Sequence, residues 1–150
     1  MNHISVNLNI IGVVHSPYKT TAEAPFQGGD EIVEIEIRKA YEEGLQDIDG
    51  FSHLHVFYWF HKSEGYSLLV HTPWDTIPHG IFTTRTPHRP NPLGYAVVEL
   101  VERKNNILRV KGLDAIDGTP VIDIKPYVKT LDGKPDAVSG WIDKTSLREE

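Results

Sequence analysis

The chain has 150 residues, no cysteine and a net charge of −6. This length predicts one domain, residues 1–150, around a single core, and the 39% hydrophobic and 24% charged fractions are typical of a globular protein and not of a disordered chain. The lack of cysteine excludes disulfides, thiolate metal sites and a cysteine nucleophile.

The distribution of charge also limits the function. Residues 1–50 contain nine acidic and three basic side chains, and the other two thirds of the chain are balanced. An acidic chain is not typical of nucleic-acid-binding proteins, so any RNA contact needs a local basic patch or one assembled across subunits. Residues 1–20 have neither a basic start nor an apolar run that continues past Gly12, so we expect no signal peptide, no membrane span and a cytoplasmic protein.

The first half of the chain predicts strands joined by loops. Residues 6–14 predict a strand, residues 17–30 a long loop, residues 33–37 a half-buried strand with an acidic outer face, and residues 39–45 a short helix. The strongest strand pattern covers residues 52–61. One face of this strand would carry Leu54, Val56, Tyr58 and Phe60, and the other His53, His55, Phe57, Trp59 and His61.

The second half continues the pattern. Further strands are expected at 66–71, 95–102, 107–113 and 121–124, with a hairpin at Asn105-Asn106 and a turn at Asp117-Gly118. About eight short strands with almost no helical period predict an all-β protein, and we prefer a small antiparallel barrel to a sandwich. The barrel core would span about 6–127, followed by an irregular extended tail, 128–150, with Trp141 as a candidate anchor.

The densest functional signal is the segment 85–94, which holds three prolines and two arginines. Proline stiffens the backbone, and a stiff cationic loop loses little entropy when it captures an anion or a carboxylate. The alternative is a proline-rich connection whose arginines are merely solvated. A second dense segment, 112–127, contains Asp114, Asp117 and Asp123. Asp117 before Gly118 is equally well explained as a turn former, and Asp123 could simply pair with Lys125, whereas Asp114 has no such explanation.

Several common sites are not expected. His53 and His55 would lie about 7 Å apart on one strand face, but His61 lies about 26 Å further along, so a third metal ligand is missing. The chain also lacks the dinucleotide-binding, P-loop and serine-hydrolase motifs.

Residues 84–94 and 113–127 resemble the two signature segments of the TsaA-like, or TrmO, family. Residues 11–19, Gly50 to Leu54 and the pair Phe60-His61 also match. The resemblance implies a small β-barrel that dimerises, binds S-adenosylmethionine and needs no metal. It further implies methylation of N6 of the threonylcarbamoyl-modified adenosine beside the tRNA anticodon. Many bacterial members carry a further C-terminal domain, so tRNA docking is expected to differ here.

The family's cofactor contacts transfer by motif to Pro25, Gln27, His61, Arg85, Tyr95, Lys111, Gly112, Leu113 and Asp114. Phe26 replaces the arginine of many members. S-adenosylmethionine carries a carboxylate, an ammonium and an adenine, to which Arg85, Asp114 and Tyr95 are chemically suited.

The expected reaction needs a proton acceptor and contacts to RNA. We expect Asp117 or Asp114 to accept a hydrogen bond from the attacking amine, and Arg89 and Lys125 to bind tRNA phosphate. The alternative is a non-catalytic module that binds S-adenosylmethionine or a nucleotide for regulation. The acidic charge favours this alternative slightly.

Overall fold

The computed structural model describes residues 3–25 and 29–145. The chain divides into two compact units, one of residues 1–61 and 93–127, and one of residues 62–92 and 128–150. That all 150 residues act as one domain stays a prediction.

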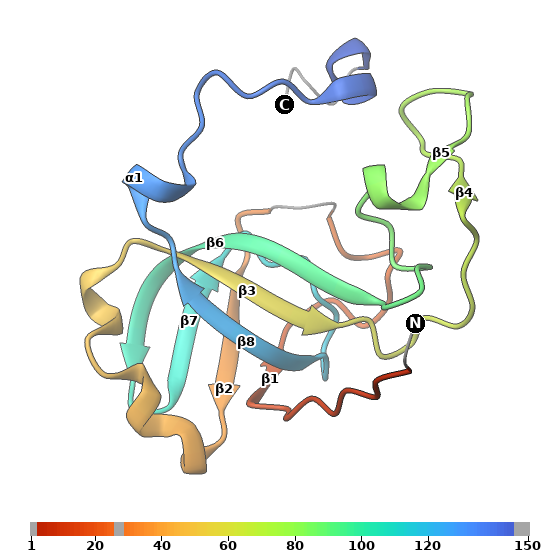
Figure 1. The fold of residues 1–150 in the computed structure, drawn as a ribbon. Helices are drawn as coiled ribbons and strands as arrows, with labels where there is room; N and C mark the ends of the chain where they lie inside the picture. Colours follow the sequence, from red (N-terminus) through yellow and green to blue (C-terminus); the bar gives the residue numbers. More distant parts are fainter. Residues whose placement is uncertain (1–2, 26–28, 146–150) are drawn as a thin grey trace. The chain divides into compact units, whose positions relative to one another are not determined.

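The first unit is a closed antiparallel barrel of six strands in the order β1-β2-β7-β6-β3-β8 (Figure 1). The strands are β1 (Gly12–His15), β2 (Ile32–Ile37), β3 (His53–Trp59), β6 (Leu93–Lys104), β7 (Ile107–Lys111) and β8 (Pro120–Pro126). The predicted all-β barrel is therefore confirmed. Closure pairs each strand on both sides, which removes the exposed edges of an open sheet.

Alternation of apolar and polar residues explains why these strands curl around one core. In β2, Val33, Ile35 and Ile37 are buried while the glutamates between them face solvent. In β3, Leu54, Val56 and Tyr58 form the predicted inner face, with at most 1% of each side chain exposed. The core also contains buried side chains from the other strands and from the segment after β7, namely Val14, Ala96, Val98, Leu108, Val110, Leu113 and Val121.

The connections of the barrel follow local sequence signals. Residues Lys39–Leu45 form a 3-10 helix, η1, at the position of the predicted short helix, and Leu45 packs into the core. A second 3-10 turn, η2, covers Ile48–Gly50. Asn105 adopts φ 55° and turns β6 into β7, so the predicted Asn-Asn hairpin is confirmed.

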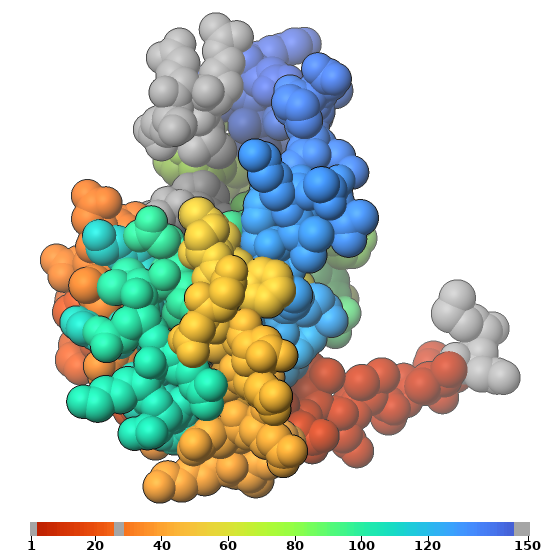
Figure 2. Space-filling view, turned by 90° about the vertical axis from the view of Figure 1, so that its left-hand side faces the viewer, coloured from red at the N-terminus to blue at the C-terminus, as the bar shows by residue number. Residues whose placement is uncertain are grey.

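The predicted strand 6–14 is wrong in its first half, because regular strand structure begins only at Gly12. Residues 3–10 form an extended N-terminal arm, in which Ile4 and Val6 are 84% and 74% exposed. Figure 2 shows this arm in red, extending away from the barrel strands. Alternation alone does not make a strand, since the backbone also needs a hydrogen-bonded neighbour, and pairing with β2 and β8 starts at Gly12.

The second unit contains little regular structure. A two-stranded sheet joins β4 (Leu69–Val70) to β5 (His79–Gly80), so the predicted strand 66–71 is limited to the two residues that have partners. A 3-10 turn, η3 (Ile81–Thr83), follows. The C-terminal tail contains two short helical turns, α1 (Lys129–Asp132) and η4 (Gly140–Lys144). Within the described ranges, no helix combines the length and the apolar character that crossing a bilayer requires.

Candidate functional site

Asp114 lies just after β7, where the chain turns away from the barrel wall. Gly112 makes this turn with φ 94°, a conformation that favours glycine, and Leu113 anchors it in the core with 1% exposure. The hydroxyl of Tyr58, on the inner face of β3, donates a hydrogen bond of 2.7 Å to Asp114 Oδ1. A buried phenol thus orients the carboxyl group at one end of the barrel.

Gly94 allows Tyr58 to reach this position. The two residues are cross-strand neighbours between β6 and β3. A Cβ atom on Gly94 would lie 2.2 Å from Cε2 of the Tyr58 ring, so any larger side chain would displace the ring. Gly94, which ends the segment 85–94, therefore has a packing role that links it to Asp114 through Tyr58.

The described start of the loop 17–30 contacts the segment after β7, because the Asp117 amide donates to the Tyr18 carbonyl at 2.7 Å. Burial raises the pKa of Tyr18, and the negative charges of Glu31 and Asp114 raise this pKa further. Pro25 packs beside Tyr18, because a Cβ on Gly29 would lie 2.9 Å from Pro25 Cγ and 3.4 Å from the Tyr18 hydroxyl. Pro25 thus lies near Tyr18 and Gly29, and its contact with the cofactor stays a prediction. Gln27 and Phe26 lie outside the described residues.

Asp117 holds a turn together. Its Oδ1 accepts a hydrogen bond of 3.0 Å from the Ser16 amide, and its Oδ2 forms a 3.0 Å ion pair with Lys19. The Ser16 hydrogen bond and then the Lys19 ammonium keep the pKa of Asp117 below its usual value. The geometry matches the turn-forming interpretation of this residue, and its catalytic role stays a prediction.

Tyr95 points to the opposite side of the barrel wall from Tyr58. Its hydroxyl lies 2.9 Å from Nδ1 of His55, and the two rings stack with centroids 5.7 Å apart. Phe57 packs beside Tyr95 with a ring separation of 5.4 Å. Because inner and outer side chains alternate along a strand, Tyr95 and the Asp114–Tyr58 pair occupy different faces. His61 is exposed and lies just beyond β3.

The remaining barrel candidates lie at strand ends. Lys111 ends β7, opposite Ile32 and Glu99 in the two neighbouring strands. Leu113 is buried, so a cofactor contact there would use its main chain. Lys125 forms a 3.2 Å ion pair with Asp123, as expected from their positions on β8. Within residues 3–25 and 29–145, no three His, Cys, Asp or Glu side chains cluster in a way that could hold a metal ion.

The segment 85–92 belongs to the second unit and is held by hydrogen bonds from Arg89 and from Ser63. Nη1 of Arg89 donates to the carbonyl oxygens of Thr84 and Thr86, at 2.9 and 3.1 Å. The hydroxyl of Ser63 donates to the Pro87 carbonyl at 3.0 Å. Arg89 thus holds the carbonyl groups on both sides of Arg85. This bracing role of Arg89 has no signal in the sequence, because every residue carries a backbone carbonyl, and its contact with RNA stays a prediction.

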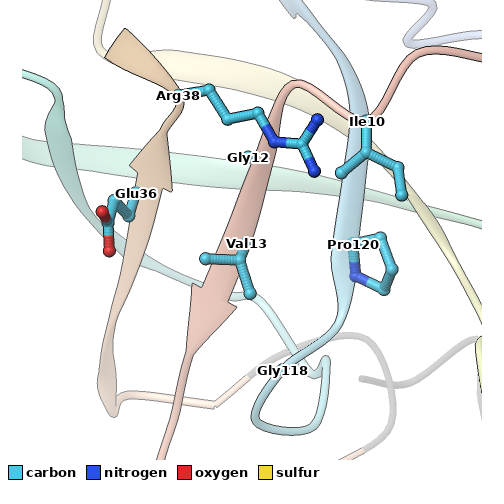
Figure 3. A pocket seen from close by; sticks show the side chains of 7 residues that line it. All are labelled: Ile10, Gly12, Val13, Glu36, Arg38, Gly118 and Pro120. Atoms are coloured by element: carbon cyan, nitrogen blue, oxygen red, sulfur yellow. The ribbon is translucent and has the colours of Figure 1, made fainter.

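Two pockets on the barrel are lined by other residues than the predicted cofactor contacts. In one, of about 290 Å³, the Arg38 side chain extends across the outside of β1 (Figure 3). Its remaining lining consists of Ile10, Gly12, Val13, Glu36, Gly118 and Pro120. The other, of about 470 Å³, is a largely apolar pocket between η1, η2 and β8. Neither lining includes Asp114 or a residue of the segment 85–92.

Comparison with known proteins shows a match to one protein family. The family described as tRNA-methyltransferase O N-terminal domain matches residues 13–133. A probable S-adenosyl-L-methionine-binding protein of Archaeoglobus fulgidus is 52% identical over 143 residues, which cover 94% of this chain and 39% of that protein. The tRNA (adenine(37)-N6)-methyltransferase of Escherichia coli is 34% identical over 152 residues, covering 93% of this chain and 65% of the enzyme.

A solved structure agrees with these sequence matches. The crystal structure of TrmO from Pseudomonas aeruginosa superposes with a TM-score of 0.79 at 31% identity. The match covers 93% of this chain and 64% of that one. The chain therefore spans less than two thirds of the length of these three proteins.

Proposed function

This chain belongs to the tRNA-methyltransferase O N-terminal domain family, and from that premise we propose that it is an S-adenosylmethionine-dependent tRNA methyltransferase acting on N6 of adenosine. The names of its relatives support the cofactor, the RNA and the reaction. The structural observation that carries the proposal is the Asp114 carboxyl group held by the Tyr58 hydroxyl, directly after the Lys111–Leu113 segment that the resemblance assigns to the cofactor.

On the barrel, the proposed cofactor contacts are Asp114 with Lys111, Gly112 and Leu113, together with Pro25, Gln27, His61 and Tyr95. Asp114 would accept hydrogen bonds from the cofactor's ammonium group, since charge-assisted hydrogen bonds are about twice as strong as neutral ones. Tyr58 supports this role because it fixes the carboxyl orientation before binding. A pre-oriented acceptor loses little entropy when the ligand binds.

On the second unit, we propose that Arg85 binds the carboxylate of S-adenosylmethionine. The guanidinium fork matches a carboxylate with two parallel hydrogen bonds. Arg89 supports this role through its bonds to the Thr84 and Thr86 carbonyls, which restrain the backbone on both sides of Arg85.

In the proposed reaction, the N6 amine attacks the methyl carbon, the carbon–sulfur bond breaks, and the amine loses a proton. A carboxylate near the amine orients it and accepts the proton as positive charge develops. Asp114 and Asp117 are the two candidates for this acceptor. The pKa of Asp117 is lowered by Ser16 and Lys19, and a carboxylate with a lowered pKa is a weaker proton acceptor.

The finer target that we propose is the threonylcarbamoyl-modified adenosine next to the anticodon, in the cytoplasm. Lys125 and Arg89 are the proposed phosphate contacts. Lys125 is the better supported of the two, because its side chain is 62% exposed, whereas Nη1 of Arg89 already binds two carbonyls.

We also propose a homodimer. Five large apolar side chains of the second unit are between 58% and 77% exposed: Tyr66, Leu68, Leu69, Ile77 and Phe82. Soluble monomers rarely expose this many large apolar side chains within a short segment, and two-fold dimers are the commonest way to cover them.

The second candidate function is a non-catalytic module that senses S-adenosylmethionine. The observation in its favour is that the 52% identical relative is named only for binding S-adenosylmethionine.

One experiment separates the two functions. Purified protein is incubated with labelled S-adenosylmethionine and tRNA, with and without the threonylcarbamoyl group, and the nucleosides are analysed by mass spectrometry. We expect an adenosine that is one methyl group heavier, and none with Arg85→Ala. Cofactor binding without methyl transfer to any tRNA would instead support the sensing module.

A further inference from the structure

The C-terminal tail contains Trp141, which contacts Thr83, two residues before Arg85 in the chain. Nε1 of Trp141, in η4, donates to the carbonyl oxygen of Thr83 at 3.3 Å and lies 3.1 Å from its hydroxyl. Thr83 in turn donates its hydroxyl proton to the Gly80 carbonyl at 2.8 Å. The tail residue therefore restrains the peptide group two residues before Arg85.

The orientation of the indole ring is set by β5. The Trp141 ring stacks on the His79 ring with centroids 3.7 Å apart and an angle of 9° between the planes. Nε2 of His79 lies 3.0 and 2.8 Å from the two carboxylate oxygens of Asp75. Because Asp75 holds His79 and His79 stacks on the indole, the direction of the indole N–H is defined.

Both sides of Arg85 are consequently held by side-chain hydrogen bonds. Trp141 holds Thr83, the Thr84 hydroxyl donates to the Ile81 carbonyl at 2.9 Å, and Arg89 holds the carbonyls of Thr84 and Thr86. If Trp141 served only to anchor the tail, its stacking on His79 would be sufficient. The indole N–H on Thr83 adds a restraint on the backbone that presents the Arg85 side chain.

We propose that Trp141 is a positioning residue for Arg85, so that the C-terminal tail sets the affinity of this chain for S-adenosylmethionine. The proposal rests on the proposed function, in which Arg85 binds the cofactor's carboxylate. A bidentate guanidinium–carboxylate pair depends on orientation, and loss of a backbone restraint weakens it without removing any charge.

The test is a double-mutant cycle measured by calorimetry with S-adenosylmethionine. Trp141→Phe keeps an aromatic ring for His79 but removes the N–H donor. We expect its dissociation constant to rise about two- to tenfold, the effect of one net hydrogen bond. The Arg85→Lys background replaces the planar guanidinium by a flexible point charge. In this background, Trp141→Phe should change the dissociation constant very little. Val138→Ala, at an 85% exposed position of the same tail, is the control and should bind like the wild type.

Two results would overturn the proposal: equal binding by Trp141→Phe and wild type, or the same loss from Trp141→Phe in both backgrounds. If the wild type itself binds no S-adenosylmethionine, the proposed function fails, and the positioning role is decided by amide hydrogen exchange. The amides of Thr83 to Thr86 should then exchange faster in Trp141→Phe than in the wild type. Unchanged exchange there would show that Trp141 does not restrain this segment.

Discussion

Asp114 and Asp117 lie three residues apart, yet different chemistry holds their carboxyl groups. Asp114 accepts from the neutral hydroxyl of Tyr58, whose ring is buried in the barrel. Asp117 accepts from a backbone amide and pairs with the Lys19 ammonium at a more exposed turn. The Ser16 hydrogen bond and then the Lys19 ammonium lower the pKa of Asp117, and its contacts are those of a turn-forming residue.

Tyr58→Phe should disturb Asp114 without changing the packing of the ring. The variant loses the 2.7 Å hydrogen bond, and hydrogen bonds to charged groups contribute roughly 1.5–3 kcal/mol. We expect a lower free energy of unfolding in urea and weaker binding of S-adenosylmethionine. Tyr41→Phe is the matched control, since Tyr41 is 41% exposed. Equal losses from the two variants would contradict the special role of Tyr58.

Asp117→Asn should reveal an acid-dependent contribution to stability. Because the folded state lowers the pKa of Asp117, the ionised carboxylate stabilises the fold above its usual pKa of 3.8, and this contribution is lost as the pH falls through the lower folded value. The wild type should therefore be more stable than the variant at neutral pH, with the difference shrinking below pH 3.8. Urea unfolding over a pH series measures it, and a difference that is constant with pH would rule out this account.

At the scale of the element, the pairing of β3 with β6 links Gly94 to Asp114 through Tyr58. Strand β6 brings Gly94 directly opposite Tyr58, so that the ring packs on bare backbone. The same pair places Tyr95 opposite Phe57 on the outer face. One register between two strands thus determines which residues serve the inner face and which the outer.

Gly94→Ala is expected to destabilise the barrel, because its methyl group would lie 2.2 Å from a Tyr58 ring atom. Overpacking of this kind costs about 1–3 kcal/mol, measured as a loss of unfolding free energy. Gly44→Ala in η1 is the control, since a Cβ there meets nothing within 4 Å. A Gly94→Ala protein as stable as the Gly44→Ala protein would show that the ring moves aside freely.

At the scale of the whole molecule, the net charge of −6 limits how the proposed RNA substrate can bind. General electrostatic attraction cannot drive tRNA binding to such a chain, so individual cations have to contribute locally. In the proposed homodimer, the second copy would add its own cations to those of the first.

Lys125→Ala should weaken tRNA binding and lower the slope of log affinity against log salt by about one, the effect of losing one phosphate contact. The slope is measured by filter binding over a salt series. Lys39→Ala, which also removes one positive charge but lies outside the proposed contacts, should leave the slope unchanged. Identical slopes for all three proteins would exclude Lys125 from the RNA contact.

Light scattering should give twice the 16.9 kDa chain mass at micromolar protein. Phe82→Ser, at a 77% exposed position, should shift the protein towards the monomer because it removes apolar area from the proposed interface. A monomeric wild type would eliminate the dimer, and a dimeric variant would place the interface elsewhere.

The sequence by itself determined those features that depend only on residues close together in the chain. Apolar alternation predicted strands at 33–37 and 52–61, which the structure has as Ile32–Ile37 and His53–Trp59. The Asn-Asn pair predicted the hairpin, and two motif segments identified the family. Tertiary structure alone decided where β1 begins, since a strand requires a partner for its backbone. It also decided the pairs Tyr58–Asp114, Lys19–Asp117 and Thr83–Trp141, which are 56, 98 and 58 residues apart. Closing a barrel or docking a tail brings such residues together, and no spacing in the chain records that contact.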